Sequence, residues 1–368
     1  PAGYRRTEKR DAFIGKRREF EVKIEQARKL LSQGKGARVE NLDVRELTVY
    51  HANRANPSGG SYEGKERYLI INKIGSGGMA SVYSAYNLSR DRHEVLKIAR
   101  PEYAENTEFR ARFFKEAERL EFFHYPSKHP NVVRVYGSGE IDGTIFIAME
   151  KIDGISLADV LGIAGRLPIL EATRLMGVIA ATFKDLHQGG IVHRDIKPEN
   201  IMLQIGEKGK ITVKIIDFGI AKDTSVVKTL TQAGTILGTP EYMPLEQLLG
   251  REIDHRTDLY SEGALFFEML TGSCPIPRGK TESSTAYLMR AFERLTVGAV
   301  PDVATYLYDI DKKGLAGVIG QMKNIFFNTL GLQKDRYSDE NVFIADLGRL
   351  EEVFIKYQDL KRSANTRT

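Results

Sequence analysis

The segment 193–200, His-Arg-Asp-Ile-Lys-Pro-Glu-Asn, and the Asp-Phe-Gly triplet that starts at Asp217 bring carboxylates, an amide and a cation together at short spacing. Phosphoryl transfer needs a carboxylate that orients the attacking hydroxyl and accepts its proton, oxygen ligands for Mg²⁺, and a cation near the moving phosphate. Asp195 can act as that carboxylate and Lys197 as the cation, while Asn200 and Asp217 can bind the metal. Two such motifs in this order rarely arise by chance, so they predict a phosphoryl-transfer site.

A glycine-rich stretch between two expected strands is the second candidate. Glycines allow the backbone of a hairpin to lie over phosphates and to point amide N–H groups at them. A strand rather than a helix follows, which disfavours a dinucleotide-binding fold. Taken alone, an ordinary β-turn explains the stretch equally well. The residues that would frame a nucleotide are Gly75, Ser76, Gly77, Gly78 and Val82.

Lys97 lies within an apolar run on a later strand, and Glu116 follows on an expected helix. A lysine whose ammonium group is buried needs an anion nearby. A surface lysine is the alternative for any single residue of this kind. The order of a glycine-rich hairpin, a strand lysine and a helix glutamate is the order of parts that hold the α- and β-phosphates of ATP.

The elements that must position these groups are strands first and helices afterwards. The expected strands are Tyr68–Ile74, Ser81–Tyr86, His93–Ile98, Val132–Gly137 and Thr144–Met149. The helix among them can be capped by Asn106 or Thr107, and its apolar stripe is Phe109, Phe113, Ala117 and Leu120. Later helices are expected at about Ile169–Gln188, Asp258–Thr271, Thr285–Arg294, Leu315–Leu330 and Asn341–Tyr357, with a hairpin tip within Gln204–Thr212. This order predicts an α+β fold, with a small β-rich lobe before a larger helical lobe.

The first part of the chain has a different character. A helix is expected over about Lys16–Gln33, with one apolar stripe, and residues 53–64 are rich in Gly, Ser and Asn, as a linker would be. A solvated helix that lies on the main domain is one interpretation. The alternative is that residues 1–64 bind a partner or an anionic surface.

Composition narrows the class of protein. Residues 1–64 hold 14 Lys/Arg and 9 Asp/Glu, which accounts for the net charge of +5 and leaves the rest formally neutral. A nucleic-acid-binding domain would carry its own basic face, so no nucleic-acid partner is expected. Cys274 is the single cysteine, which suits a reducing compartment, and no apolar stretch approaches the roughly 20 residues of a membrane helix. We therefore expect a cytoplasmic protein, or the cytosolic part of a longer one.

Together the motifs resemble the protein kinase superfamily, closest in style to the bacterial Hanks-type serine/threonine kinases. The resemblance implies a bilobal kinase domain over residues 67–355, with an N-lobe of residues 67–150 and a C-lobe of residues 151–355. A basic extension, residues 1–66, would precede it and a polar tail, residues 356–368, would follow. It also implies a signalling enzyme that uses ATP with Mg²⁺ or Mn²⁺ to phosphorylate Ser and Thr hydroxyls of protein substrates.

The resemblance assigns roles to individual residues. Lys97 pairs with Glu116, Asp195 is the catalytic aspartate, and Asn200 and Asp217 bind Mg²⁺. Nucleotide contacts are further expected from Met149 as the gatekeeper and from the hinge that runs from Glu150 to Ile152. Lys197 is typical of the serine/threonine branch, Thr239 is expected beside Asp195, and Asp258 is expected to bind the backbone at His193 and Arg194.

The chain departs from the family where Ala-Pro-Glu is usual, since it reads Pro244-Leu245-Glu246. Glu246 is expected to pair with Arg336. Glu262 stands where an apolar residue is common, and the sequence assigns it no role.

Threonines upstream of Thr239 predict control by phosphorylation, with autophosphorylation at Thr231 and Thr235 ranked first and Arg194 as the partner of the added phosphate. The alternative is that they are ordinary loop residues. A nucleotide-binding pseudokinase scaffold is the second hypothesis for the function, but pseudokinases usually lack one of the catalytic residues that this chain retains. A small-molecule kinase is disfavoured by the long segment from Asp217 to Glu246.

Overall fold

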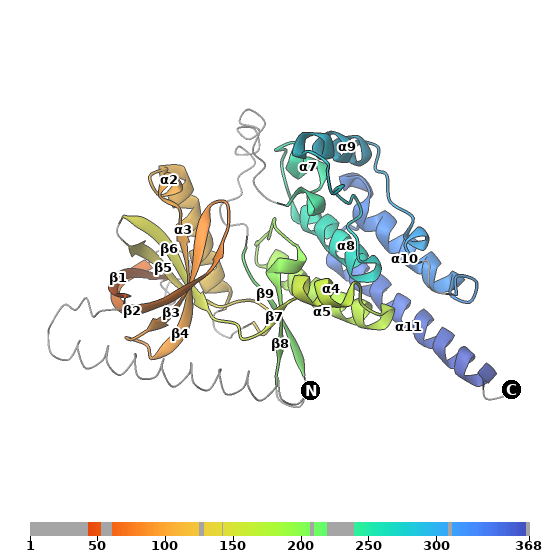
Figure 1. Ribbon diagram of the computed structural model, residues 1–368, viewed down its shortest axis with the longest axis horizontal. Helices are drawn as coiled ribbons and strands as arrows, with labels where there is room; N and C mark the ends of the chain where they lie inside the picture. Colours follow the sequence, from red (N-terminus) through yellow and green to blue (C-terminus); the bar gives the residue numbers. More distant parts are fainter. Residues whose placement is uncertain are drawn as a thin grey trace. The chain divides into compact units, whose positions relative to one another are not determined.

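The computed structural model describes residues 43–52, 61–124, 129–141, 143–206, 210–218, 239–307 and 311–365. The chain divides into two compact units (Figure 1). Of the described residues, the first unit contains those up to His124 and residues 134–151. The second unit contains residues 129–133 and those from Ile152 onward.

Six antiparallel strands form a closed barrel in the first unit, in the order β1-β2-β3-β4-β6-β5. Their bounds are β1 (Asp43–Ala52), β2 (Ser61–Ser76), β3 (Ala80–Asn87), β4 (Arg92–Ala99), β5 (Val135–Ile141) and β6 (Thr144–Glu150). β1 closes the barrel because it pairs with β2 along one side and with β5 along the other. The strands wrap around the side chains of Tyr68, Ala85, Leu96, Phe146 and Ala148, all fully buried.

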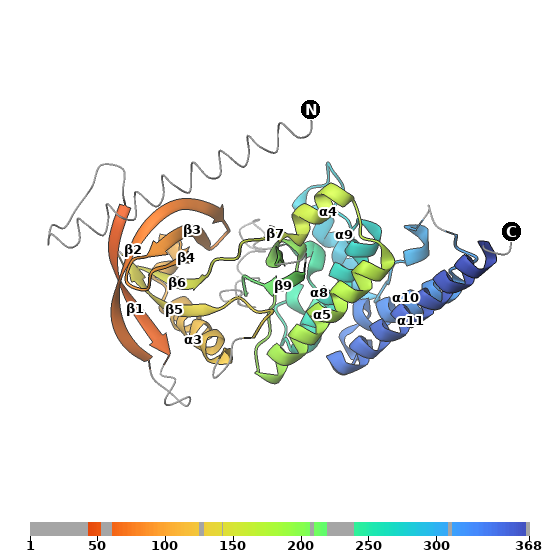
Figure 2. The same ribbon diagram turned by 90° about the horizontal axis from the view of Figure 1, so that it is seen from below.

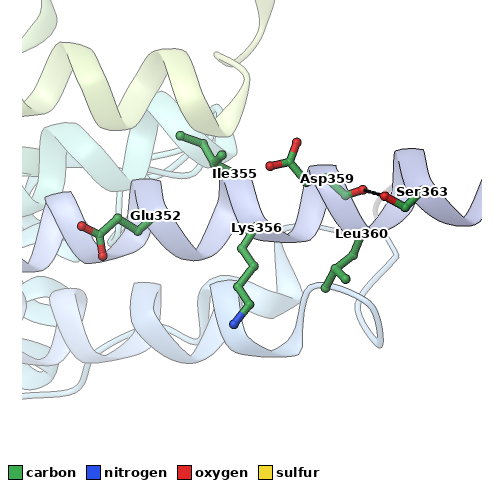
Figure 3. Close-up of a pocket in the computed structure, with 6 residues that line it drawn as sticks. All are labelled: Glu352, Ile355, Lys356, Asp359, Leu360 and Ser363. Carbon is green, nitrogen blue, oxygen red and sulfur yellow. Dashed lines mark hydrogen bonds between the residues drawn. The ribbon is translucent and has the colours of Figure 1, made fainter.

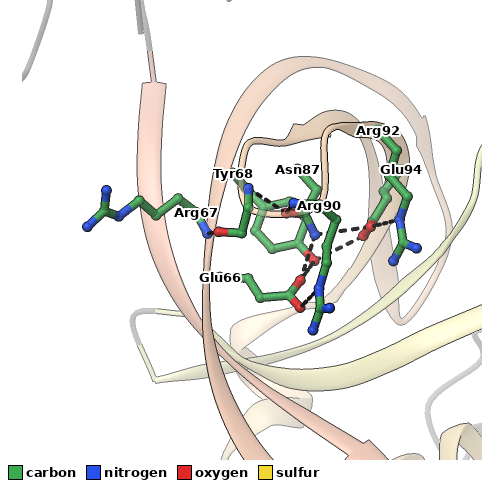
Figure 4. A network of polar contacts seen from close by, with 8 residues as sticks. Glu66, Arg67, Tyr68, Asn87, Arg90, Arg92 and Glu94 are labelled. Atoms are coloured by element: carbon green, nitrogen blue, oxygen red, sulfur yellow. Dashed lines mark hydrogen bonds and ion pairs between the residues drawn. The ribbon is translucent and has the colours of Figure 1, made fainter. Parts of the chain in front are cut away.

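A polar network joins β2, β3 and β4 at one end of this barrel (Figure 4). The hydroxyl of Tyr68 donates to Glu66 at 3.1 Å and to Glu94 at 2.9 Å, and the amide of Asn87 donates to the same two carboxylates. Arg90 and Arg92 each form an ion pair with one of them. Burial, reinforced by both carboxylates, raises the pKa of Tyr68 far above its usual range, so the hydroxyl stays a donor. The network therefore fixes how the three strands pair.

The helices of the first unit are α2 (Pro101–Ala104) and α3 (Thr107–Phe123). Asn106 caps α3, since its side chain accepts the N–H of Phe109 at 2.8 Å. The predicted apolar stripe is buried, and α3 packs against β5. The prediction for this helix is confirmed.

The second unit is mainly helical (Figure 2). Its longer helices are α4 (Leu157–Ala164), α5 (Ile169–Gln188), α8 (His255–Thr271), α9 (Ser284–Thr296), α10 (Ala316–Leu330) and α11 (Glu340–Asn365), with the single turn α7 (Leu245–Leu248). Single 3₁₀ turns are η1 (Pro198–Asn200), η3 (Pro240–Tyr242), η4 (Val303–Thr305) and η5 (Gln333–Asp335). A small sheet contains β7 (Ile155–Ser156), β8 (Ile201–Ile205) and β9 (Ile211–Ile215). α8 is buried over almost its whole length between α5 and α10, and α11 packs against both of those helices.

The hairpin of β8 and β9 confirms the prediction for residues 204–212, and α5 has the predicted bounds. β1 and α4 were not predicted from the sequence. The predicted linker also runs into β2, which begins at Ser61 rather than at Tyr68. The last helix was expected to end at about Tyr357, but α11 continues to Asn365 into the polar tail. None of the helices in the described ranges has the length and apolar character needed to cross a bilayer.

Candidate active site

The loop before β8 brings three of the predicted residues together. Lys197 Nζ lies 3.2 Å from Asp195 Oδ2 and donates to Thr239 Oγ1 at 3.3 Å. The amide nitrogen of Asn200 donates to the main-chain oxygen of Asp195 at 2.8 Å and to its Oδ2 at 3.2 Å. Because that nitrogen faces Asp195, the amide oxygen of Asn200 is the atom that a metal would contact.

Asp258, on α8, holds the backbone before Asp195. Its Oδ2 accepts the N–H of His193 at 2.7 Å and its Oδ1 accepts the N–H of Arg194 at 2.9 Å, as predicted. Arg194 has φ of 66°, a left-handed conformation that is uncommon for a residue with a side chain. Such a backbone persists only where its surroundings hold it, and two charge-assisted hydrogen bonds do so here.

Asp217 follows β9 and also has a positive φ, 57°. Two contacts join its segment to the loop of Asp195. The N–H of Ile216 donates to the main-chain oxygen of Asn200 at 2.9 Å, and the ring of His193 reaches the oxygen of Ile216 at 3.1 Å. Burial lowers the pKa of His193, so its ring is neutral. These contacts place the two expected metal ligands on connected segments of one unit.

His187, in the last turn of α5, forms a hydrogen bond with Asp258. Its ring nitrogens lie 2.8 Å from Asp258 and 2.8 Å from Glu340, the first residue of α11. Burial alone lowers the pKa of His187, but its hydrogen bonds to the two carboxylates outweigh burial and raise the pKa to about 10. The imidazolium in turn helps to hold the pKa of Asp258 below its usual range, against the opposing effect of burial. Three helices therefore meet at the aspartate that holds the loop of Asp195.

Glu262 lies one turn after Asp258 on α8 and is fully buried. Neither of its carboxylate oxygens has a hydrogen-bond partner among the residues that the structure describes. Burial raises the pKa of Glu262 well above its usual range. The nearby charges of Glu340 and Asp258 raise it further, and the charge of His187 opposes them. The folded chain therefore favours the protonated form of this residue up to a higher pH than the unfolded chain does.

Replacing Glu262 by glutamine should stabilise the protein, by about 1–3 kcal/mol at pH 8. The folded-state pKa is raised, so the parent loses stability as pH climbs above the unfolded value, and the advantage of Glu262→Gln should grow with pH. Urea unfolding at about pH 4 and about pH 8 measures this difference. The exposed Glu352→Gln serves as the matched control, with no such trend. A Glu262→Gln advantage that is equal at both pH values would contradict the protonated state.

The glycine-rich residues form the turn between β2 and β3 in the first unit. Gly75 pairs with Val82 and Ser76 with Ser81, and the N–H of Gly77 donates to the oxygen of Ala80 at 2.8 Å. Lys97 on β4 is the direct neighbour of Val82 on β3. The hairpin, its valine and the strand lysine therefore occupy adjacent positions on one sheet.

The expected hinge residues lie at the end of β6. Met149 and Glu150 pair across the sheet with Val95 and Glu94, while Ile152 belongs to the second unit. The side chain of Glu116 and the residues Thr231 and Thr235 lie outside the described part of the chain. The pairing of Lys97 with Glu116 and the two phosphorylation sites stay predictions.

The predicted pair of Glu246 and Arg336 is confirmed. Arg336 Nη1 lies 2.6 Å from Glu246 Oε1, and Nη2 donates to Oε2 at 3.2 Å. Both side chains are buried, and Thr257 Oγ1 also donates to Glu246 at 3.3 Å. The guanidinium further donates to two main-chain oxygens, those of Gly331 and Arg256. The pair anchors α7 to the start of α8 although the residues before Glu246 depart from the family.

A shallow pocket on α11 lies apart from these residues (Figure 3). It is lined by one helix alone, with Ser363 Oγ donating to the main-chain oxygen of Asp359. Its few polar groups do not converge on a point, so we assign it no chemistry.

A comparison with known families agrees with this geometry. The sequence profile of the protein kinase domain matches residues 68–312, so the chain belongs to the protein kinase family. Bacterial serine/threonine kinases are among its relatives.

The chain is 38% identical over 226 residues to the serine/threonine-protein kinase pkn3 of Myxococcus xanthus, covering 60% of this chain and 41% of that protein. It is 40% identical over 209 residues to PrkC of Bacillus subtilis, covering 57% of this chain and 31% of the relative. It is 34% identical over 226 residues to PknB of Mycobacterium leprae, covering 60% of this chain and 35% of that protein. The chain thus matches less than half the length of these curated relatives.

Two residues that support the site, His187 and Gln247, were not predicted from the sequence. His187 could have been suspected as the last-turn histidine of a helix that ends just before the catalytic loop. Gln247 directly follows Glu246, but no spacing rule connects it to the loop that it contacts.

Proposed function

We propose that this chain is a serine/threonine protein kinase that transfers the γ-phosphate of ATP to hydroxyls of proteins, with Asp195 as the catalytic aspartate. The observation that carries the proposal is the arrangement of Asp195, Lys197 and Asn200 on a loop whose strained backbone Asp258 holds. Carboxylate and amide oxygens are ligands that Mg²⁺ prefers, and Asn200 and Asp217 offer one of each. Mn²⁺ has the same preference for oxygen and could replace it.

In the proposed reaction the hydroxyl oxygen of a substrate Ser or Thr forms a bond to the γ-phosphorus, while the bond from that phosphorus to the β-γ bridging oxygen breaks and ADP leaves. Asp195 orients the hydroxyl and accepts its proton. Lys197, held between Asp195 and Thr239, places positive charge beside the moving phosphate. A bound Mg²⁺ would neutralise charge on the phosphates.

Most of the residues proposed to bind the nucleotide belong to the first unit. The N–H groups of the turn from Gly75 to Gly78 would meet the phosphates, with Val82 beside them and Lys97, paired with Glu116, on the α- and β-phosphates. Met149, Glu150 and Ile152 would border the adenine. Protein substrates and a cytoplasmic location fit this activity, and residues 1–64 are proposed to bind a partner or an anionic surface.

Incubating the chain with radiolabelled ATP and Mg²⁺, with and without myelin basic protein as a generic acceptor, tests the proposal. A kinase labels the acceptor on Ser and Thr. The pseudokinase alternative instead predicts nucleotide binding with no transfer at any enzyme concentration, and that result would overturn the proposal. The loss of a catalytic residue would favour the pseudokinase alternative, but the chain retains all four of them: Lys97, Asp195, Asn200 and Asp217.

Phosphorylation should switch the enzyme through Thr231 and Thr235. Arg194 Nε is buried without a hydrogen-bond partner among the described residues, which suits a guanidinium that receives a phosphate. We expect Thr231→Ala, Thr235→Ala to lower phosphorylation of an external substrate by at least about tenfold. Mass spectrometry should find phosphate between Asp223 and Leu237 in the parent and none in Asp195→Asn. Equal activity of the double variant and the parent would contradict this control.

A further inference from the structure

Gln247 lies immediately after the buried Glu246, on the single turn α7, and is itself buried. Its side-chain nitrogen donates to the main-chain oxygen of Arg194 at 2.9 Å. Arg194 precedes the catalytic aspartate and has the left-handed backbone described above. A residue 53 positions further along the chain thus contacts the peptide bond that leads into Asp195.

That peptide group is held at both ends. Its oxygen, from Arg194, accepts from Gln247, and its nitrogen, from Asp195, donates to His193 Nδ1 at 3.2 Å. Asp258 instead accepts the N–H groups of His193 and Arg194, which belong to the two preceding peptide groups. Because this peptide group leads into the Cα of Asp195, a change in the torsion on one side of its plane that the other side does not offset would redirect the carboxylate of Asp195.

The donor is itself rigidly placed. Glu246 is fixed by its two hydrogen bonds to Arg336, and Thr257 donates to Glu246 from the residue before Asp258. Two consecutive residues on α7 and two on α8 therefore connect the buried ion pair to the catalytic loop. A hydrogen bond from such a fixed donor costs little ordering entropy and opposes relaxation of the strained backbone.

We propose that Gln247 is a positioning residue for phosphoryl transfer, which fixes the peptide plane before Asp195 and so the direction of the catalytic carboxylate. The inference rests on the proposed kinase activity, because its effect is on the orientation of the proton acceptor. With this role, the segment 244–247, Pro-Leu-Glu-Gln, helps to hold the catalytic loop. The same segment also holds the region that follows the activation segment.

Gln247→Leu removes the donor at nearly constant size. We expect kcat to fall roughly 10- to 100-fold with the KM for ATP within about twofold of the parent. The matched control is Gln321→Leu, which removes a glutamine bond to the main-chain oxygen of Asp346, between α10 and α11, and should leave kcat unchanged. Amide hydrogen exchange over His193–Lys197 should accelerate in Gln247→Leu and not in the control, whether or not the parent shows activity.

Gln247→Glu separates positioning from packing. At neutral pH its carboxylate would face the oxygen of Arg194 without a proton to donate, whereas the protonated acid can donate again. The activity of this variant relative to the parent should therefore rise as pH falls towards about 5. A role in packing alone predicts a ratio that does not change with pH.

The outcomes are distinct. A parent that transfers no phosphate overturns the proposed function, and hydrogen exchange then decides the role of Gln247. If the parent is active and both Gln247 variants have the same kcat, pH profile and loop exchange as the parent, the positioning role is overturned and the proposed function is not. If Gln247→Leu does not fold, the pH profile of Gln247→Glu carries the test.

Discussion

Replacing Asp217 by asparagine should reduce phosphate transfer on the order of 100- to 1000-fold while the protein stays folded. Asparagine tolerates a left-handed backbone, so the φ of 57° at this position can persist and the loss reports the carboxylate charge. Nucleotide binding without Mg²⁺ should remain nearly unchanged, because the carboxylate acts through the metal. In Lys97→Met, by contrast, the phosphates themselves lose a partner, and nucleotide affinity should fall with or without Mg²⁺.

Asp91 offers a matched control for this substitution. It also has a left-handed backbone, with φ of 54°, and accepts a hydrogen bond from Tyr86 in the turn between β3 and β4. Asp91→Asn should retain the turnover of the parent. Near-normal turnover of Asp217→Asn at ordinary Mg²⁺ would show that the metal ligand is another residue.

Breaking the ion pair between Glu246 and Arg336 should lower the free energy of unfolding by about 3–5 kcal/mol for either single variant. Each change leaves the other charge buried, and replacing Arg336 also removes the contact of its guanidinium with the ring of Tyr260, whose centre is 5.1 Å away. The double variant Glu246→Gln, Arg336→Met should cost much less than the sum of the two. Urea unfolding of all four proteins gives the coupling energy directly.

The exposed pair of Asp359 and Arg362 on α11 is the control for that cycle. Its charged atoms are 3.9 Å apart and both side chains are largely exposed. A surface pair of this kind should show a coupling of about 0.5 kcal/mol or less. A coupling of the same small size between Glu246 and Arg336 would mean that they do not stabilise the fold as a pair.

The mutual placement of Asp195, Lys197 and Asn200 could be predicted from the sequence because they lie close together along the chain. Asp195, Lys197 and Asn200 are separated by so few positions that one loop conformation decides their geometry, and α5 is delimited by its own periodicity. The pair of Glu246 and Arg336 needed the family resemblance, since nothing local connects residues so far apart.

What could not be predicted depends on distant partners. β1 forms a strand because it pairs with β2 and with residues 138–140 of β5. The sequence of residues 43–52 does not indicate either partner. Glu262 has no hydrogen-bond partner among the described residues because of how other segments pack around α8. Gln247 contacts Arg194, which is far from it in the sequence. In each case the decisive interaction joins segments that the sequence keeps apart.

The most direct test of the account compares the dephosphorylated parent with Asp195→Asn in one experiment. Each protein is incubated with ATP and Mg²⁺ and its intact mass is followed over time. The account predicts that the parent gains whole phosphate units while Asp195→Asn, equally folded by circular dichroism, gains none. Equal phosphate gain in both proteins would contradict the assignment of Asp195, and a parent that neither gains phosphate nor labels a generic acceptor would contradict kinase activity itself.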